Sequence, residues 1–351
     1  MAGNTKIEWT RGDDGSLGAT WNPVVGCSLV SPGCTNCYAM RTAARFNHSP
    51  FSPYLGLTKT VNGKPVWTGE VGFNPKALEA PLHWKKPRRI FVNSMGDLFH
   101  ESVPDEWIDK VFAVMALAPQ HTFQVLTKRA DRMRDYLSDG ALNGRIACAS
   151  VDAHLPDELL RRPSIPLPNV WLGVSAEDQE RADERIPLLL DTPAAVRFVS
   201  VEPQLGPVDL SRLEIARFRH DGEVAVPRKI GDVPAAYVNG LDGSVWGKVE
   251  ADENYARVLG ADVGKLSWTI IGGESGPGAR PFDLTWARSI IAQCKAAEVA
   301  CFVKQCGSRP VDSNGGEVAY GPILLRDKKG GIMSEWPHDL QIRQFPNAGV
   351  V

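Results

Sequence analysis

Short β-type runs alternate with amphipathic helical stretches along most of the chain, and this rhythm limits the choice of fold more than any other feature. Most runs are apolar on both faces, as in strands that helices cover on either side. The runs occupy residues 20–25, 89–94, 122–127, 170–174, 197–201, 268–271 and 301–304, with helical stretches at 104–117, 177–190 and 284–297. A βαβα order implies a parallel sheet with right-handed crossovers. Seven such runs predict an α/β fold, a full or partial parallel (β/α) barrel.

The length of the chain fits one large domain that carries insertions. The chain has 351 residues, and single α/β barrels commonly exceed about 200 residues. We therefore expect one barrel domain over residues 1–351. Residues 141–168 contain four prolines and predict a loop-rich insertion. Residues 207–266 are polar and glycine-rich, and predict an inserted subdomain or lid.

Charge and hydropathy exclude some classes of protein. The net charge of −2 gives no global attraction to nucleic acid or to an anionic membrane, so such contacts would need a local patch. No apolar run reaches the roughly 18 residues that a membrane-spanning helix needs. The polar start of the chain does not resemble a signal peptide. We expect a cytoplasmic protein in a reducing compartment, where crowded cysteines favour metal binding or catalysis over disulfides.

The strongest local signal is a cysteine cluster with the spacing C-x6-C-x2-C, formed by Cys27, Cys34 and Cys37. Thiolates are soft ligands that suit zinc or iron–sulfur centres. Three of them can hold three irons of a [4Fe-4S] cluster, with Pro32 and Gly33 supplying the turn around it. The open fourth iron could be chelated by the amino and carboxylate groups of S-adenosylmethionine. An electron from the cluster would then cleave the sulfonium to a 5′-deoxyadenosyl radical.

Other interpretations of the cysteines stay open. A structural zinc site would need a fourth ligand, and His48 is the nearest candidate in the sequence. The sequence has no second C-x2-C pair. The remaining cysteines have no ligand-type spacing, and some lie in strand or helix patterns where cysteine is often a core residue: Cys148, Cys294, Cys301 and Cys306. The spacing favours the iron–sulfur cluster over zinc and over unrelated thiols.

Polar residues follow six of the predicted strands. In parallel α/β folds, ligands collect at the carboxyl ends of strands. The candidates are Gly96, Asp97, Lys128, Ser175, Glu177, Glu202, Gly272, Gly273, Glu274 and Lys304. Each one alone could be a helix cap or a solvated turn, but together they predict a site for a polar ligand. The turn 272–278 could let backbone N–H groups approach an anion or an adenosine moiety, and the two lysines could neutralise a carboxylate or a phosphate.

Several motifs resemble a phage- and prophage-associated radical-SAM-like family with three cysteines. They are Thr5-Lys6-Ile7-Glu8-Trp9-Thr10, Thr20-Trp21-Asn22-Pro23-Val24-Val25-Gly26-Cys27, Asn93-Ser94-Met95-Gly96-Asp97-Leu98-Phe99, Gly272-Gly273-Glu274-Ser275-Gly276 and Lys304-Gln305. The resemblance implies a radical-SAM barrel, a [4Fe-4S] cluster and S-adenosylmethionine, and leaves the substrate open. The wider superfamily usually has C-x3-C-x2-C, so this chain departs from it by three residues. The superfamily layout would place Gly96 and Asp97 near the methionine amino group and Glu177 near the ribose.

Three functions follow as hypotheses. The first is a radical-SAM enzyme that takes electrons from an external donor and acts on a small polar substrate, a nucleotide or a nucleic acid. The second is a zinc-stabilised nucleic-acid-binding protein, using basic patches at 85–89, 128–132 and 161–162 with Tyr54, Trp67 and Trp84 for stacking. The third is a metal-free hydrolase in which Asp97, Glu202 and Glu274 serve as general acid and base. The oligomeric state is left open.

Overall fold

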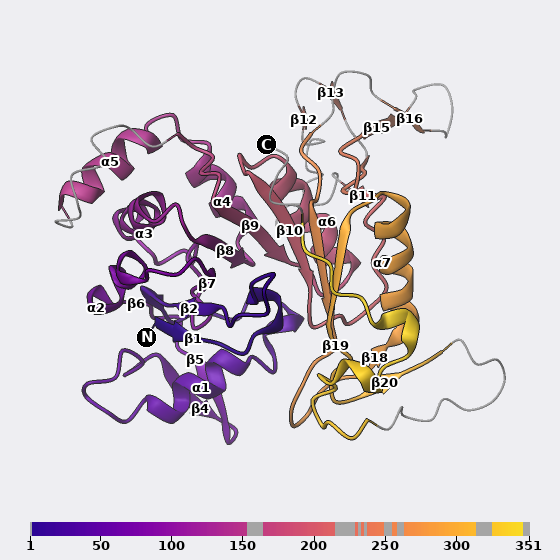
Figure 1. Ribbon diagram of the computed structural model, residues 1–351, viewed down its shortest axis with the longest axis horizontal. Coiled ribbons are helices and arrows are strands. Elements are labelled where there is room, and N and C mark those ends of the chain that lie inside the picture. Colours follow the sequence, from indigo (N-terminus) through magenta and orange to yellow (C-terminus); the bar gives the residue numbers. More distant parts are fainter. Residues whose placement is uncertain are drawn as a thin grey trace. The chain divides into compact units, whose positions relative to one another are not determined.

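The computed structural model describes residues 2–152, 164–214, 229–230, 233–234, 237–248, 255–257, 263–313 and 325–346. The fold is mixed α/β, and its largest sheet has eight strands in the order β1-β2-β7-β8-β9-β10-β17-β19 (Figure 1). These strands are Ala2–Asn4, Ala19–Trp21, Arg89–Val92, Thr122–Thr127, Val170–Ser175, Val196–Val201, Trp268–Gly272 and Ala300–Gln305. All seven predicted strands are therefore confirmed, and they lie in the sheet in chain order.

The predicted barrel is confirmed only as a mostly parallel sheet. The strand order runs from β1 to β19 without closing. The first strand, β1, pairs antiparallel with β2, and the sequence did not predict it because its residues are small and polar. The chain divides into two compact units at a boundary inside β9. Unit 1 comprises Met1–Gly173 with Pro193–Ala195, and unit 2 comprises Val174–Thr192 with Val196–Val350.

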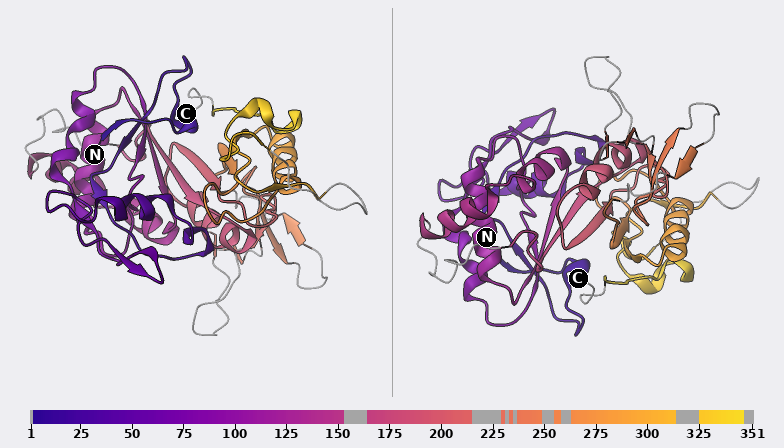
Figure 2. Two further views of the ribbon diagram at one scale, coloured as in Figure 1. Left: turned by 90° about the horizontal axis from the view of Figure 1, so that it is seen from below. Right: turned by 90° about the horizontal axis from the view of Figure 1, so that it is seen from above.

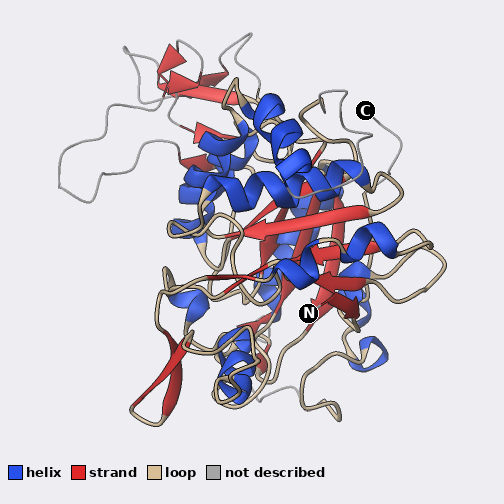
Figure 3. Ribbon diagram, turned by 90° about the vertical axis from the view of Figure 1, so that its left-hand side faces the viewer, coloured by secondary structure: helices blue, strands red, loops and turns tan. Residues whose placement is uncertain are grey.

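In unit 1, β2, β7 and β8 form a parallel array. Its helices are α1 (Tyr38–Phe46), α2 (Pro75–Leu78), α3 (Asp105–Leu117), α4 (Ala130–Leu137) and α5 (Leu142–Asp152), with 3-10 turns at Glu8–Thr10, Pro32–Cys34 and Ala80–His83. Two antiparallel pairs join it: β3 (Val24–Val25) with β6 (Gly72–Phe73), and the hairpin of β4 (Thr58–Val61) with β5 (Lys64–Trp67). Figure 3 shows the hairpin β4–β5 projecting beside α1, against which it packs.

The helix α3 confirms the helical stretch predicted at 104–117. It begins after Pro104, and two acidic residues occupy its first turn, where the helix dipole favours negative charge. Its buried face repeats at helical spacing through Ile108, Val111, Phe112 and Met115.

The prediction of a loop-rich insertion at 141–168 is wrong for its first part. Residues Leu142–Asp152 form helix α5, which packs against α3. Leu142, Ile146 and Ala149 are buried at helical spacing, so an apolar stripe outweighs the turn signals of the prolines that follow. Residues 153–163 lie outside the described residues, and 164–168 carry no helix or strand.

In unit 2, β10, β17 and β19 form a second parallel array. Helices α6 (Gln179–Leu190) and α7 (Leu284–Ala296) begin at the caps Asp178 and Asp283, whose carboxylates accept backbone N–H groups. Helix α7 packs against β17 and β19 (Figure 2). Further short elements are β18 (Phe282–Asp283) paired with β20 (Pro310–Val311), and 3-10 turns at Met333–Glu335 and His338–Leu340.

The predicted insertion at 207–266 contains a small antiparallel sheet in the order β11-β14-β15-β16. Its strands are Leu213–Glu214, Tyr237–Val238, Val245–Lys248 and Tyr255–Arg257, and a separate pair joins β12 (Lys229–Ile230) to β13 (Val233–Pro234). Residues 215–228, 231–232, 235–236, 249–254 and 258–262 lie outside the described residues. Its role as a lid stays a prediction. Within the described ranges, no helix is long and apolar enough to cross a membrane.

Candidate functional site

In unit 1, a frame of hydrogen bonds joins the end of β2 to the end of β7, and the cysteine loop follows this frame in the chain. The Asn22 Oδ1 atom accepts hydrogen bonds from Ser94 Oγ (3.1 Å) and from the Met95 N–H (2.9 Å). The Asn93 Oδ1 atom accepts the N–H of Val24 at 3.2 Å. These bonds satisfy buried polar groups and fix the segment that leads into Cys27. Two of the motifs that carry the family resemblance thus build this frame.

Two glycines make the frame compact. Gly26 has φ +92° and forms an isolated parallel bridge with Gly96, and its N–H donates to Met95 O at 3.1 Å. A Cβ on Gly26 would collide with the backbone oxygen of Glu70, and a Cβ on Gly96 would lie 3.0 Å from Gly26 O. Close approach of two backbones therefore explains the glycine at 96. Its predicted contact with a methionine amino group stays a prediction.

Substitution of Gly26 with alanine is expected to lower the free energy of unfolding by about 2 kcal/mol or more, because it combines left-handed backbone strain with a steric clash. The matched control is Gly144→Ala, inside α5, where an added Cβ meets nothing within 4 Å. That variant is expected to be stabilised by roughly 0.5–1 kcal/mol. Urea unfolding of both variants measures the difference, and equal midpoints would contradict the assigned role of Gly26.

The three cysteines occupy three local settings in unit 1. Cys27 directly follows Gly26, Cys34 ends the 3-10 turn Pro32–Cys34, and Cys37 caps the start of α1. All three are free thiols, with Cys34 buried and the other two half-buried. The Cys34 Sγ atom lies 3.9 Å from Ser31 Oγ. In the part of the chain that the structure describes, no three His, Cys, Asp or Glu side chains form a group that could hold a metal ion.

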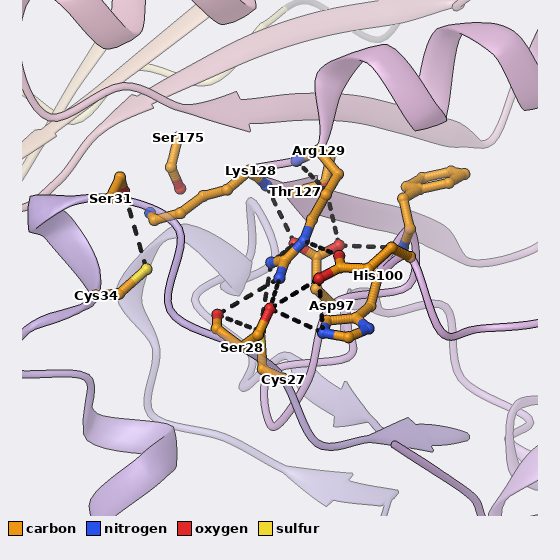
Figure 4. Close-up of polar contacts among 12 residues, drawn as sticks. Cys27, Ser28, Ser31, Cys34, Asp97, His100, Thr127, Lys128, Arg129 and Ser175 are labelled. Atoms are coloured by element: carbon orange, nitrogen blue, oxygen red, sulfur yellow. Dashed lines mark hydrogen bonds and ion pairs between the residues drawn. The ribbon is translucent and has the colours of Figure 1, made fainter. Parts of the chain in front are cut away.

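Arg129 connects the cysteine loop to the end of β8 (Figure 4). Its Nη1 donates to Cys27 Sγ at 3.4 Å and to Asp97 Oδ2 at 3.1 Å. Its Nη2 donates to Ser28 Oγ at 2.6 Å, and its Nε to Glu101 Oε2 at 3.2 Å. The side chain is only 8% exposed. A buried guanidinium with this many partners has one fixed orientation, and one of its donors is directed at a sulfur.

Asp97 holds Arg129 and the loop after β8 in place. Its Oδ1 accepts Thr127 Oγ1 (2.6 Å) and the N–H of Phe99 (3.0 Å). Its Oδ2 accepts Arg129 Nη1 and the N–H of Lys128, both at 3.1 Å. Both carboxylate oxygens are thus occupied within the protein. A direct role in catalysis or cofactor binding stays a prediction that would require one of these bonds to open.

Burial and charge tune the groups around Cys27. Burial, together with the negative charge of Asp97, raises the pKa of the Cys27 thiol to about 12, and Arg129 opposes the shift. For Arg129, burial disfavours the charged form, but the charges of Asp97, Cys27 and Glu101 outweigh it and raise its pKa. Burial and the positive charge of Arg129 lower the pKa of His100, whose Nε2 lies 3.0 Å from Ser28 Oγ. The local field therefore favours a cationic arginine beside a neutral histidine.

Lys128 differs from its neighbour because its ammonium group has no hydrogen bond or ion pair with any described residue. The residue is half-buried, and its backbone N–H is held by Asp97. In Figure 4 its side chain extends toward the segment that carries Ser31 and Cys34. A half-buried cation without a counter-charge is suited to bind an anionic group of a ligand.

Unit 2 has its own polar cluster at the carboxyl ends of β10, β17 and β19. Lys304 Nζ donates to both oxygens of Glu202, at 2.7 and 3.0 Å. Gln305 Nε2 bridges Glu202 Oε1 (3.1 Å) and Gly273 O (2.9 Å). A Cβ on Gly272 would lie 3.2 Å from Glu202 Oε1, so the glycine leaves room for this carboxylate. The structure thus brings together four of the predicted residues of unit 2: Glu202, Gly272, Gly273 and Lys304.

The turn after β17 is occupied by its own contacts. Glu274 accepts the backbone N–H of Arg280 at 2.9 Å and the Arg280 guanidinium at 2.7 Å. The N–H of Gly273 donates to Gln305 O at 3.0 Å, and the N–H of Gly276 to Ser308 Oγ at 2.9 Å. These two N–H groups, which were expected to approach an anion, already have partners. The remaining part of that prediction stays untested.

Glu177 and Ser175 lie against α6. The Glu177 carboxylate is fully buried, and its Oε2 accepts Arg185 Nη1 at 3.2 Å. The same Nη1 donates to the backbone oxygen of Ser175 at 2.8 Å. A ribose hydroxyl could reach Glu177 only after this pair opens. In this geometry Glu177 holds Arg185 beside the end of β9, and its predicted contact with a ribose stays a prediction.

The described arginines of the predicted basic patches are engaged in the fold. Arg89 is buried and pairs with Asp13 at 2.7 Å, and Arg132 pairs with Asp105. The aromatic residues Tyr54 and Trp67, expected to stack on bases, are core residues with 1% and 6% exposure. This prediction is wrong for them because sequence proximity to lysine and arginine says nothing about which way a ring faces. Residues 161 and 162 lie outside the described residues.

The other cysteines agree with the expectation that they are core residues, with one exception. Cys294, Cys301 and Cys306 are buried at 0–3% exposure, whereas Cys148 is exposed on α5. Arg129 was considered in the sequence only as part of a basic patch, and its contact with Cys27 was missed. The available signal was its position directly after Lys128 at the end of a strand, where ligand-facing residues concentrate.

Comparisons with known proteins give one result for this chain. Neither the comparison with curated proteins nor that with solved structures finds a match. A family model described as "Protein of unknown function (DUF5131)" matches residues 4–331, which includes the frame, the cysteine loop and both polar clusters. The chain therefore belongs to this family.

Proposed function

We propose that this protein is a radical-SAM-like enzyme that holds a [4Fe-4S] cluster through Cys27, Cys34 and Cys37. The observation that carries the proposal is the buried Arg129, held by two carboxylates, with a donor 3.4 Å from Cys27 Sγ. A cation beside a sulfur favours the thiolate, the form in which cysteine binds metals, so Arg129 offsets part of the rise in the pKa of Cys27 that burial and Asp97 cause. Hydrogen bonds to ligand sulfurs also tune iron–sulfur centres.

The donor set fits a three-cysteine cluster better than a closed zinc site. Structural zinc needs four ligands. His48 follows the far end of α1, whereas Cys37 caps its start, and a nine-residue helix is about 13 Å long. His100 is buried and hydrogen-bonded to Ser28 Oγ and to the N–H of Ser102. The three thiols do not form a ready metal group among the described residues, so the fit rests on donor type and on Arg129.

The fold is compatible with this proposal. A parallel sheet whose strands follow chain order, as β2-β7-β8-β9-β10-β17-β19 do, has the winding of a barrel and lacks the reversal of a doubly wound sheet. We therefore propose a partial (β/α) barrel, which agrees with the resemblance to the phage-associated radical-SAM-like family.

A bound cluster would supply the electron for reductive cleavage of S-adenosylmethionine to methionine and 5′-deoxyadenosine, with an external donor as the electron source and the substrate as the source of hydrogen. The chain itself contributes fixed charges. Lys128 offers a free ammonium group for a carboxylate or phosphate. Lys304 is already paired with Glu202 and instead shapes the polar cluster of unit 2.

The hydrolase hypothesis loses support from the same contacts. Each of its three carboxylates is engaged by a cation: Asp97 by Arg129, Glu202 by Lys304 and Glu274 by Arg280. A general base needs a lone pair directed at its substrate, whereas these carboxylates accept hydrogen bonds from cations of the fold.

The test is reductant-dependent formation of 5′-deoxyadenosine, measured by mass spectrometry on anaerobically reconstituted protein. We expect product from the wild-type chain and none from Cys34→Ala, whereas Cys148→Ser, at the exposed cysteine, stays active. Lys128→Met is expected to reduce product formation about tenfold, because one hydrogen bond to a charged group is lost. Lys76→Met, an exposed lysine on α2, is the matched control. Equal product from the wild-type and Cys34→Ala chains would refute the proposal.

A further inference from the structure

The surface of unit 1 next to the cysteine loop has an unusual charge distribution. The whole chain has 39 basic and 41 acidic residues, yet residues 15–69 contain Arg41, Arg45, Lys59 and Lys64 and no Asp or Glu. This segment includes the cysteine loop, α1 and the hairpin β4–β5. The segment is thus a local positive region in a protein that is close to neutral overall.

Helix α1 presents one solvent-facing stripe in which two arginines lie between two aromatic side chains. The residues lie at i, i+3, i+4, i+7 and i+8, which is a single helix face: Tyr38, Arg41, Thr42, Arg45 and Phe46. The opposite face, with Ala39, Met40 and Ala43, is buried in the core that includes Tyr54 and Trp67. Tyr38 is 51% exposed and Phe46 is 47% exposed, and the Phe46 ring also contacts the ring of Tyr54 at a centroid distance of 6.3 Å.

The cations of the stripe are not used by the fold. In the described part of the chain, neither Arg41 nor Arg45 makes an ion pair or a side-chain hydrogen bond. This contrasts with Arg129, Arg185 and Arg280, which are each paired with a carboxylate. Tyr38 is held in place, since its hydroxyl donates to Ser94 O at 2.7 Å and leaves the ring face outward. A third exposed ring, Phe51, follows α1 and is 95% exposed.

We propose that this stripe (Tyr38, Arg41, Thr42, Arg45 and Phe46) binds single-stranded nucleic acid and that, resting on the function proposed above, the substrate is a nucleotide within such a strand. Unpaired guanidinium groups suit phosphates, and exposed rings stack on unpaired bases. An acidic protein partner would also match the charge. Two rings that flank two arginines, without an aliphatic anchor in the stripe, favour bases and phosphates. The stripe begins one residue after Cys37, so a bound strand would pass the cysteine loop.

The test is fluorescence anisotropy with labelled oligonucleotides of about 16 nucleotides, single- and double-stranded, across a salt series. Arg41→Gln/Arg45→Gln is expected to weaken single-strand binding at least tenfold and to reduce the log–log salt slope by about 1.4. Phe46→Ala is expected to weaken it about tenfold through loss of one stacked base. The matched control is Lys85→Gln/Lys86→Gln, which removes two exposed charges from another surface of unit 1 and should change affinity less than about twofold.

Circular dichroism and thermal melting confirm that the variants fold, and Arg41→Lys/Arg45→Lys, which keeps the charge, should retain the salt slope. The inference would be overturned if the chain bound no oligonucleotide, or if it bound duplex and single strand with equal affinity. It would also be overturned if Arg41→Gln/Arg45→Gln and Lys85→Gln/Lys86→Gln lost the same amount of affinity for the single strand. A third contrary result would be an Arg41→Gln/Arg45→Gln variant that loses affinity for a reduced acidic iron–sulfur protein but keeps its affinity for the oligonucleotide. The assay needs neither iron nor S-adenosylmethionine. A chain that binds the single strand but takes up no iron would therefore contradict the proposed cluster and leave the proposed nucleic-acid site standing.

Discussion

Replacement of Arg129 with methionine is expected to lower the free energy of unfolding by about 3–5 kcal/mol and to abolish iron uptake by the cysteine loop. Asp97 is 7% exposed as a side chain, and the variant would leave its carboxylate buried without its cation. The same substitution removes the donor to Cys27 Sγ and the bonds to Ser28 that hold the start of the loop. Urea unfolding and iron analysis after anaerobic reconstitution measure the two effects.

Two controls separate these effects. Arg134→Met removes an arginine from α4 whose partner, Asp135, is 64% exposed, so a change below about 1 kcal/mol is expected. The double variant Arg129→Met/Asp97→Asn should recover part of the lost stability, since no unpaired buried charge remains, but it should not recover iron uptake. Full iron uptake by Arg129→Met would show that the guanidinium has no part in the cluster site.

Arg185→Met is expected to cost about 3–5 kcal/mol of unfolding free energy in unit 2. The pair Arg185–Glu177 has side-chain exposures of 2% and 0%, so removal of the cation takes the counter-charge from a fully buried carboxylate. It also removes the bond to Ser175 O, which fixes the end of β9. Chemical denaturation of the purified variant measures the loss.

The matched control is Arg181, which lies one helical turn before Arg185 on α6. Arg181 pairs with Glu180 and Glu184, which are 64% and 51% exposed, so Arg181→Met should change stability by less than about 1 kcal/mol. In addition, Glu177→Leu/Arg185→Met should be more stable than Arg185→Met alone. If Arg181→Met and Arg185→Met lost similar amounts of unfolding free energy, the buried pair would contribute no more to stability than the exposed pairs.

The strands could be predicted because their signal is local. Runs such as Val170–Ser175 and Trp268–Gly272 consist mostly of apolar residues and are followed by turn residues, so burial on both faces can be read from the sequence. The antiparallel β1 gives no such signal, because Ala2, Gly3 and Asn4 are not β-type residues and only pairing with β2 makes them a strand. Helix α5 was hidden by the prolines that follow it.

The candidate site could be predicted only in part, because pairing is not local. The positions of Asp97, Glu202 and Lys304 at strand ends are confirmed, but the sequence could not show which charges neutralise one another. Glu177 pairs with Arg185 on the following helix, which the sequence did not show, and its place near a ribose stays a prediction. The stripe on α1 was also missed, although the 3.6-residue period and the absence of acidic residues at 15–69 were both readable.

Anaerobic reconstitution with iron and sulfide, followed by metal analysis and electron paramagnetic resonance, tests the cysteine site most directly. We predict about four irons per wild-type chain, with an S-adenosylmethionine-dependent change in the spectrum of the reduced protein. Single substitutions to alanine at Cys27, Cys34 or Cys37 should each remove this iron, whereas Cys148→Ser should retain it. A wild-type chain that binds about one zinc and no iron, or that keeps its iron without Cys34, would contradict the proposed cluster.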